Sequence, residues 1–295
     1  SIMRLSSVAL TAGRWLQVPD EEQKSVLITG CSSGIGYAAA RGLKQRGYRV
    51  FATARKSEDV NRLAGEGFEA ARLDLDDAGS IGSAVEEVLE LSGNRLYGLF
   101  NNGAFGQPGA VEDLTTEVLR AQFESNLFGW HELTRQILPV MRRQGEGRII
   151  QNSSILGFVA MAYRGAYNAS KYALEGLSDT LRLELHGTGI HVSLIEPGPI
   201  ATRFRINALA KWRENIDQEH SFHREAYRRV AERLEKVGPA VPFTLPPDAV
   251  LKRVIHALEN RRPQARYYVT VPTYLFGTLK RLLPVKAMDW MLRRI

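Results

Sequence analysis

A glycine-rich turn near the N-terminus constrains the fold of this chain more than any other feature. The apolar run Val26-Leu27-Ile28 leads into Thr29-Gly30-Cys31-Ser32-Ser33-Gly34-Ile35-Gly36, and a helix-favouring stretch follows at 37–43. Strand, glycine turn and helix in this order form a dinucleotide-binding unit, because backbone N–H groups at the helix N-terminus hold a pyrophosphate. Glycines let the backbone approach the phosphates, here with the spacing Gly-x-x-x-Gly-x-Gly. The turn therefore predicts an α/β fold that binds a dinucleotide.

The rest of the chain alternates between short apolar runs and helix-favouring stretches. The runs are typical of parallel strands covered on both faces, and they lie at 26–28, 49–53, 68–73, 96–100, 148–152, 191–195 and 266–270. Helices are expected at about 34–46, 78–91, 116–143, 165–187 and 248–260. Right-handed crossovers then predict a Rossmann-type doubly wound sheet. We expect a single domain over 24–271 with a helical substrate lid at 203–245, an N-terminal extension at 1–23 and an amphipathic tail at 272–295.

Tyr167 and Lys171 lie four residues apart in a predicted helix, with Ser154 thirteen residues before the tyrosine. Residues four apart share a helix face, so the phenol and the ammonium are expected side by side. A fixed cation stabilises the phenolate and lowers the tyrosine's pKa from about 10 toward a value useful for acid–base catalysis. Ser154 is then expected to hydrogen-bond the reacting oxygen. Taken alone, such a pair is more often a solvated helix face.

Together these motifs resemble the short-chain dehydrogenase/reductase family over about residues 24–270. The resemblance is carried by the turn Thr29–Gly36, by Tyr167-x-x-x-Lys171 with Ser154, by Asp74, Asn101-Asn102-Gly103-Ala104 and Asn126, and by Pro197-Gly198-Pro199-Ile200-Ala201-Thr202. One departure is Gly103-Ala104, where the family usually has Ala-Gly. The pattern is most similar to bacterial NADP-dependent aldehyde reductases, with hydroxysteroid and retinol dehydrogenases as close relatives.

The resemblance implies that NADPH delivers hydride to a carbonyl carbon while Tyr167 gives a proton to its oxygen. Lys171 would lower the tyrosine's pKa and bind the nicotinamide ribose, Ser154 would orient the carbonyl, and Asn126 would hold a water of the proton relay. Ser153 is the alternative serine, although the run Ser154-Ile155-Leu156-Gly157 favours Ser154, and Asn101 and Asn126 have a structural alternative. The implied cofactor contacts are Gly30, Ser32, Ser33, Gly34, Ile35, Gly36, Arg55, Lys56, Asp74, Leu75, Asn102, Gly103, Tyr167, Lys171, Pro197, Gly198, Ile200 and Thr202.

Cofactor preference is read at the end of the second predicted strand. An acid there holds the ribose hydroxyls of NAD, whereas a nearby arginine accommodates the 2′-phosphate of NADP. This chain has Ala54 in the acid's place, with Arg55 and Lys56 directly after it. Ser33 stands where some NADP-dependent members carry another basic residue. We therefore expect NADP(H), with a surface role as the alternative for Arg55.

Composition narrows the remaining classes. The chain carries a net charge of +7, but its basic residues are spread along the sequence and no nucleic-acid motif accompanies them. A single cysteine rules out an intrachain disulfide framework and suits the cytoplasm. The 6 histidines offer no convincing metal set, and no apolar run is long enough to span a membrane. We predict no nucleic acid, no metal and no membrane span.

The substrate is expected to be a small apolar carbonyl or alcohol. The segment 159–164 should line the pocket with mostly apolar groups, and no cluster of charged residues is evident for holding a charged substrate. The tail combines aromatics, leucines and bases, which suits packing over the pocket or a subunit contact and also peripheral membrane contact. We expect a homo-oligomer, either a dimer or a tetramer. The alternatives are an oxidising hydroxysteroid or retinol-type dehydrogenase and, from another class, a non-catalytic NADP sensor.

Overall fold

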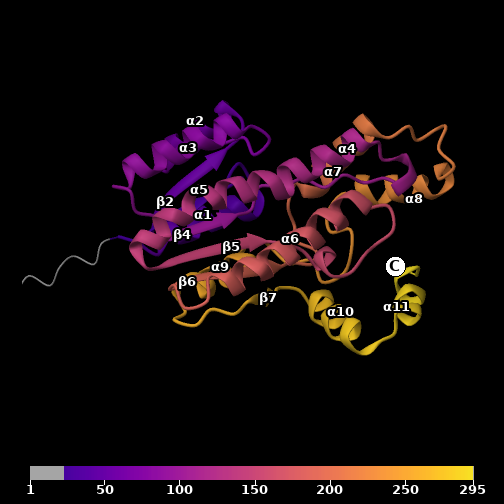
Figure 1. The fold of residues 1–295 in the computed structure, drawn as a ribbon. Helices are drawn as coiled ribbons and strands as arrows, with labels where there is room; N and C mark the ends of the chain where they lie inside the picture. The colour runs from indigo at the N-terminus through magenta and orange to yellow at the C-terminus, as the bar shows by residue number, and fades with distance from the viewer. Residues whose placement is uncertain (1–22, 295) are drawn as a thin grey trace, which may run out of the picture.

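The structure is a computed structural model that describes residues 23–294. Its centre is a parallel sheet of seven strands in the order β3-β2-β1-β4-β5-β6-β7 (Figure 1). The strands are β1 (Ser25–Ile28), β2 (Arg49–Ala54), β3 (Glu69–Arg72), β4 (Gly98–Asn101), β5 (Gly147–Asn152), β6 (Ile190–Glu196) and β7 (Arg266–Tyr268). The predicted single-domain, Rossmann-type α/β fold is confirmed. The expected extension at 1–23 lies outside the described residues except for its last residue.

Helices cover both faces of the sheet (Figure 1). The helices are α1 (Gly34–Gln45), α2 (Ser57–Gly65), α3 (Ala78–Leu91), α4 (Thr116–Phe123), α5 (Gly129–Gln144), α6 (Gly165–Glu184), α7 (Phe204–Asn215), α8 (Arg224–Glu235), α9 (Asp248–Glu259), α10 (Val271–Leu282) and α11 (Val285–Leu292). One apolar cluster packs α1 and α9 on one face, and a second packs α3 and α5 on the other. Burial of both faces explains why β1, β4 and β5 read as continuous buried runs.

Three short helical elements complete the chain. Two are 3₁₀ turns, η1 (Val111–Asp113) and η3 (Ile155–Gly157), and the third, η2 (Glu124–Phe128), is a π-helix between α4 and α5. The helix predicted over 116–143 is therefore interrupted, and the interruption lies at Asn126. The helix α2, which begins directly after Lys56, was not expected from the sequence. The strand β7 ends before its predicted limit at residue 270, because Thr270 already precedes α10.

The lid and tail helices gather at one end of the sheet (Figure 1). The lid segment is closed at its base, because Ala201 N donates to Leu245 O at 2.9 Å and Leu245 N donates to Pro199 O at 3.1 Å. In the tail, Phe276 and Met288 pack against Val159 in the loop after η3. Both additions therefore border the loops that follow β5 and β6.

Substituting Gly129 by alanine tests how closely α5 approaches the loop after β3. A Cβ at Gly129 would lie 2.2 Å from the backbone oxygen of Leu75, so the loop or the helix must move. We expect a loss of roughly 1–3 kcal/mol in the free energy of unfolding, measured by urea denaturation. Gly82→Ala in α3 is the control, because nothing lies within 4 Å of its Cβ position. That variant should be neutral or slightly stabilised, and equal stabilities of the two variants would contradict the packing.

Candidate active site

Tyr167 and Lys171 lie on α6, and Ser154 lies at the end of β5 where the chain enters η3. The Ser154 side chain accepts from Leu156 N at 3.1 Å and lies close enough to the Tyr167 phenol to lower its pKa in part. The helix thus brings together the three residues that the sequence predicted to act as a group.

Lys171 is buried, with 1% of its surface exposed. Its Nζ donates to the backbone oxygen of Asn152 at 2.8 Å and lies 4.2 Å from the centre of the Trp130 ring. Burial lowers the pKa of Lys171 to about 7, while the carboxylate of Glu175 raises it in part. The ammonium is therefore held in one position by the sheet on one side and an aromatic ring on the other.

The phenol of Tyr167 is covered by the first residue of α7. The rings of Tyr167 and Phe204 meet edge to face with their centres 5.3 Å apart. Burial raises the pKa of Tyr167 to about 12, and the Ser154 hydrogen bond and the Arg164 cation lower it only in part. This direction is opposite to the expected one, because desolvation outweighs the charges and Lys171 Nζ lies 5.7 Å from the tyrosine ring.

Asn126 lies within the π-helix η2 and is fully buried. Its Nδ2 donates to Phe105 O at 2.9 Å and contacts Ser170 Oγ at 3.4 Å, and its Oδ1 accepts from Phe105 N at 3.3 Å. Single π-turns inside α-helices are frequent at functional sites. Asn126 therefore connects the central helix to the loop after β4 and to the helix that carries Tyr167, whereas Asn101 contacts only buried polar groups, at Thr134 and Gln151.

The glycine turn has the close approach that a pyrophosphate site needs. Gly30 and Gly34 have φ values of 70° and 59°. A Cβ at Gly36 would lie 2.3 Å from the oxygen of Gly30, and a Cβ at Gly34 would lie 3.1 Å from Thr202 Cγ2. Ser33 precedes α1 without a side-chain cap, so the first N–H groups of that helix keep their donors for an anion. These features fit a dinucleotide.

The loop after β4 lies directly against this turn. Asn102 N and Gly103 N donate to Thr29 Oγ1 at 2.8 and 2.9 Å, and a Cβ at Gly30 would lie 2.6 Å from Gly103 Cα. Neither Gly103 nor Ala104 has a positive φ, so the exchanged order of these residues requires no strained backbone. Leu75 packs beside Gly103.

The remaining predicted cofactor residues lie at the same end of the sheet. Asp74 and Leu75 follow β3, Ser32 and Ile35 lie within the glycine turn, and Pro197, Gly198, Ile200 and Thr202 follow β6. Pro197 O accepts from Ile155 N at 2.9 Å, which ties the loop after β6 to the loop of Ser154. The structure thus gathers these segments around one edge, as a doubly wound fold requires.

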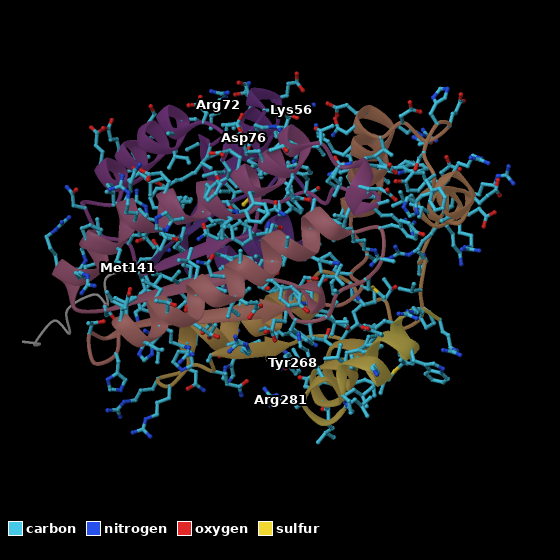
Figure 2. The ribbon with its side chains drawn as sticks, turned by 45° about the vertical axis from the view of Figure 1, so that its right-hand side comes forward. Lys56, Arg72, Asp76, Met141, Tyr268 and Arg281 are labelled. Atoms are coloured by element: carbon cyan, nitrogen blue, oxygen red, sulfur yellow. The ribbon has the colours of Figure 1, made fainter. Side chains whose placement is uncertain are left out.

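Two further arginines join Arg55 and Lys56 at the end of β2. Arg72 pairs with Ala54 in the sheet and donates from Nε to Arg55 O at 3.2 Å, and Figure 2 shows Lys56 and Arg72 at the same edge of the molecule. Arg62 on α2 donates to Ser32 O at 2.7 Å. The sequence reasoning missed both, and the only available signal was that Arg72 ends the strand beside Arg55. Together they form a basic rim next to the glycine turn.

Two other kinds of site are absent from residues 23–294. No three His, Cys, Asp or Glu side chains in this part of the chain gather in a way that could hold a metal ion. No helix among the described residues is both long and apolar enough to cross a bilayer.

Comparison with known proteins identifies the family. The family model for short chain dehydrogenase matches residues 24–212. An uncharacterized oxidoreductase of Escherichia coli K12, YbbO, is 46% identical over 271 residues, which cover 92% of this chain and 94% of the relative. The chain therefore belongs to the short-chain dehydrogenase/reductase family, whose members are oxidoreductases acting on alcohol or carbonyl groups.

Two further relatives bear on the chemistry. The 17-beta-hydroxysteroid dehydrogenase type 6 of Bos taurus is 33% identical, and the match covers 95% of this chain and 92% of that protein. A variant of actinorhodin polyketide ketoreductase, solved with NADPH, is 30% identical with a TM-score of 0.70, and the match covers 84% of this chain and 95% of that one. The resemblance to nicotinamide-dependent reductases and hydroxysteroid dehydrogenases is confirmed at the level of the family.

A buried pair of carboxyl groups lies behind the predicted catalytic residues. Glu196 at the end of β6 is 0% exposed, and Glu175 lies one turn after Lys171 on α6. Arg266 on β7 approaches Glu175 at 3.1 Å and Glu196 at 3.2 Å, the latter without hydrogen-bond alignment. Burial and the Glu175 carboxylate raise the pKa of Glu196 far above its ordinary value. Arg266 also contacts Asp179 at 2.7 Å, so one arginine serves three acids, and burial favours the protonated form of the carboxyl pair.

The proton on this pair makes folding stability depend on pH. A carboxyl group whose pKa is higher in the folded state stabilises the fold below its ordinary pKa of 4.5, and this contribution is lost as the pH rises toward the raised value. Glu196→Gln keeps the shape and cannot ionise, so its melting temperature should fall less than that of the wild type between about pH 5 and pH 9. Glu87→Gln, at an exposed position of α3, is the control. Parallel pH profiles for all three proteins would show that Glu196 is ionised in the folded state.

Proposed function

We propose that this protein is an NADPH-dependent reductase of apolar aldehydes or ketones. The observation that carries the proposal is the grouping of Ser154, Tyr167 and Lys171 at the sheet edge where the glycine turn and Thr202 meet. When bound, NADPH supplies hydride to the carbonyl carbon. Ser154 then orients the carbonyl oxygen, and the Tyr167 phenol donates the proton that this oxygen needs.

Tyr167 can serve either direction of the reaction. As a phenol it donates the proton in carbonyl reduction, and burial, which raises its pKa, favours this protonated form. As a phenolate it would be the base in alcohol oxidation. The 33% identity to a hydroxysteroid dehydrogenase supports alcohol oxidation as the alternative function. Comparing rates with NADPH and with NADP⁺ distinguishes reduction from oxidation. A pure NADP sensor is less well supported, because both Tyr167 and Lys171 are present.

Lys171 holds α6 against the end of β5. Its Nζ is fixed on Asn152 O, and Asn152 Nδ2 donates to Asn102 Oδ1 at 2.9 Å. The lysine is thereby connected to the loop that lies against the glycine turn. This arrangement supports a role of Lys171 in holding the nicotinamide ribose near Tyr167, which is what the family resemblance implies.

Apolar residues of the lid and the tail support an apolar substrate. The lid packs α7 and α8 through a cluster that includes Ala208, Trp212 and Tyr227, with Tyr163 from the loop before α6 against it. The tail adds Phe276 beside Val159. Each methylene buried in such surroundings contributes about 0.8 kcal/mol, so apolar chains are expected to bind better than short polar ones.

Removing the phenol hydroxyl tests the proposed acid. Tyr167→Phe should lose roughly 10²-fold or more in kcat for carbonyl reduction while still binding NADPH, because a positioned proton donor is lost and the ring remains. Tyr172→Phe on the same helix, whose exposed hydroxyl contacts Lys280 Nζ at 3.1 Å, is the matched control and should keep normal turnover. Normal turnover of the Tyr167 variant in stopped-flow and steady-state assays would remove the proposed mechanism.

Arg55 is expected to select NADPH through its 2′-phosphate. A guanidinium–phosphate pair is charge-assisted, and NADH has no phosphate there. Arg55→Ala should therefore lower the ratio of kcat/KM for NADPH to that for NADH by roughly tenfold or more. Arg120→Ala, at an exposed position of α4, is the control. An unchanged ratio would show that Lys56, Arg72 or Ser33, and not Arg55, selects NADPH over NADH.

A further inference from the structure

Three arginines converge beside Tyr167 from separate parts of the chain. Arg164 directly precedes α6, Arg205 is the second residue of α7, and Arg233 lies in the last turn of α8. All three side chains are partly buried. The ring of Tyr163, directly before Arg164, meets that of Tyr227 on α8 edge to face with their centres 5.9 Å apart, and Arg205 Nη2 donates to Gly238 O just after α8 at 2.7 Å. Burial and the charge of Arg233 lower the pKa of Arg164, and burial and the charge of Arg205 lower that of Arg233. Their positions, 164, 205 and 233, are too far apart in the sequence to read as a basic cluster.

Arg164 is held in place next to the reacting group. Its backbone forms a bridge with Gly109, and its carbonyl accepts from Asn168 N at 2.8 Å. It lies three residues before Tyr167, and its cation attracts the phenolate. Arg205 directly follows Phe204, whose ring covers Tyr167. The arginines therefore border the place where a carbonyl would react.

None of the three forms a salt bridge with any of residues 23–294. Arg164 Nη1 contacts only the weak acceptor Met161 Sδ at 3.2 Å, and Arg233 makes no side-chain hydrogen bond within this part of the chain. Arg205 Nη2 donates to Gly238 O at 2.7 Å and also to Lys236 O, which ties α7 to the end of α8, while its Nε is buried without a partner.

Two other arginines of the lid have an acidic partner. Arg213 contacts Glu235 at 2.5 Å, and Arg228 contacts Glu225 at 3.0 Å. Arginine stays protonated in proteins, and burying its charge without an anion is costly. Two partly buried cations that repel each other are most stable with an anion between them. The pKa values of Arg164 and Arg233 are lowered by burial and by this repulsion, which agrees with a missing negative charge.

We propose that Arg164 and Arg233 form a subsite for an anionic group of the substrate, a carboxylate, phosphate or sulfonate. This inference rests on the proposed carbonyl reduction and names the substrate class as an amphiphile with an apolar chain. Arg164 directly precedes α6 and lies three residues before Tyr167. The anionic group is expected on the side of the reacting carbonyl that Arg164 borders, with the apolar chain along the lid. Arg205 positions the end of α8 and takes no part in binding.

A matched pair of substrates tests the subsite. The pair is an oxo acid with a long apolar chain and its methyl ester, assayed at saturating NADPH. The wild type should show a KM for the acid at least about tenfold below that for the ester, since charge-assisted bonds to a guanidinium are strong. Arg233→Gln should raise the KM of the acid about tenfold and leave that of the ester unchanged. Arg229→Gln, at an exposed position on α8, is the matched control and should retain the preference.

The outcomes separate this inference from the proposed function. If the wild type reduces the ester and the acid with equal KM, or if Arg233→Gln affects both alike, the subsite is refuted while carbonyl reduction stands. If the wild type reduces neither compound nor any neutral aldehyde, the proposed function itself fails. Arg233→Lys keeps the charge and loses the paired N–H donors of the guanidinium, so it should retain part of the preference. This variant also controls for a folding defect in the glutamine variant.

Inorganic phosphate distinguishes a substrate group from a free anion. Phosphate that shares the subsite should raise the KM of the acid in the wild type, leave the ester unaffected, and have no effect on Arg233→Gln. If phosphate instead inhibits acid and ester equally in the wild type, the arginines hold a separate anion and the substrate assignment is wrong.

Discussion

The buried contact between Lys171 Nζ and Asn152 O organises the rest of the site. It joins α6 to the end of β5 at 2.8 Å. Asn152 Nδ2 in turn donates to Asn102 Oδ1 at 2.9 Å, and Asn102 Nδ2 donates to Thr29 O at 3.0 Å. This chain of polar contacts runs from the helix of the proposed acid to the glycine turn. Since each group in it is largely buried, removing one partner leaves another without its hydrogen bond. The geometry of the proposed acid and of the cofactor turn is therefore set by one connected network.

Burial changes the pKa values of the ionisable groups at this site. It lowers the pKa of Lys171 and raises those of Tyr167 and Glu196, so each group is driven toward its neutral form. The carboxyl pair has Arg266 as a partner within the fold. Arg164 and Arg233 cannot give up their charge and have no acidic partner among residues 23–294, which is why we look for their anion in the substrate.

The sequence predicted the sheet well because its strands are buried on both faces and appear as short apolar runs. The helix at 78–91 was predicted with its observed limits. The short helix α2 was missed, since it has only 9 residues and Leu63 alone among them is buried. The π-helix at Asn126 was missed because it depends on a contact with Phe105, from another loop.

The candidate site was likewise predicted only where local sequence spacing determines it. Tyr167, Lys171, Ser154 and the glycine turn could be found because local spacing places them. The arginines at 164, 205 and 233 belong to three separate elements, and the pKa of Tyr167 is raised by burial in the folded chain. Local spacing in the sequence shows neither.

Transfer of an isotopic label tests the central claim most directly. The enzyme would be given NADPH that carries deuterium on the transferable position of the nicotinamide ring, together with a long-chain aldehyde, and the alcohol would be examined by mass spectrometry and NMR. The account predicts one deuterium on the carbinol carbon of each alcohol formed. An alcohol without deuterium when either face of the ring is labelled, or NADPH that binds and is not consumed, would contradict it.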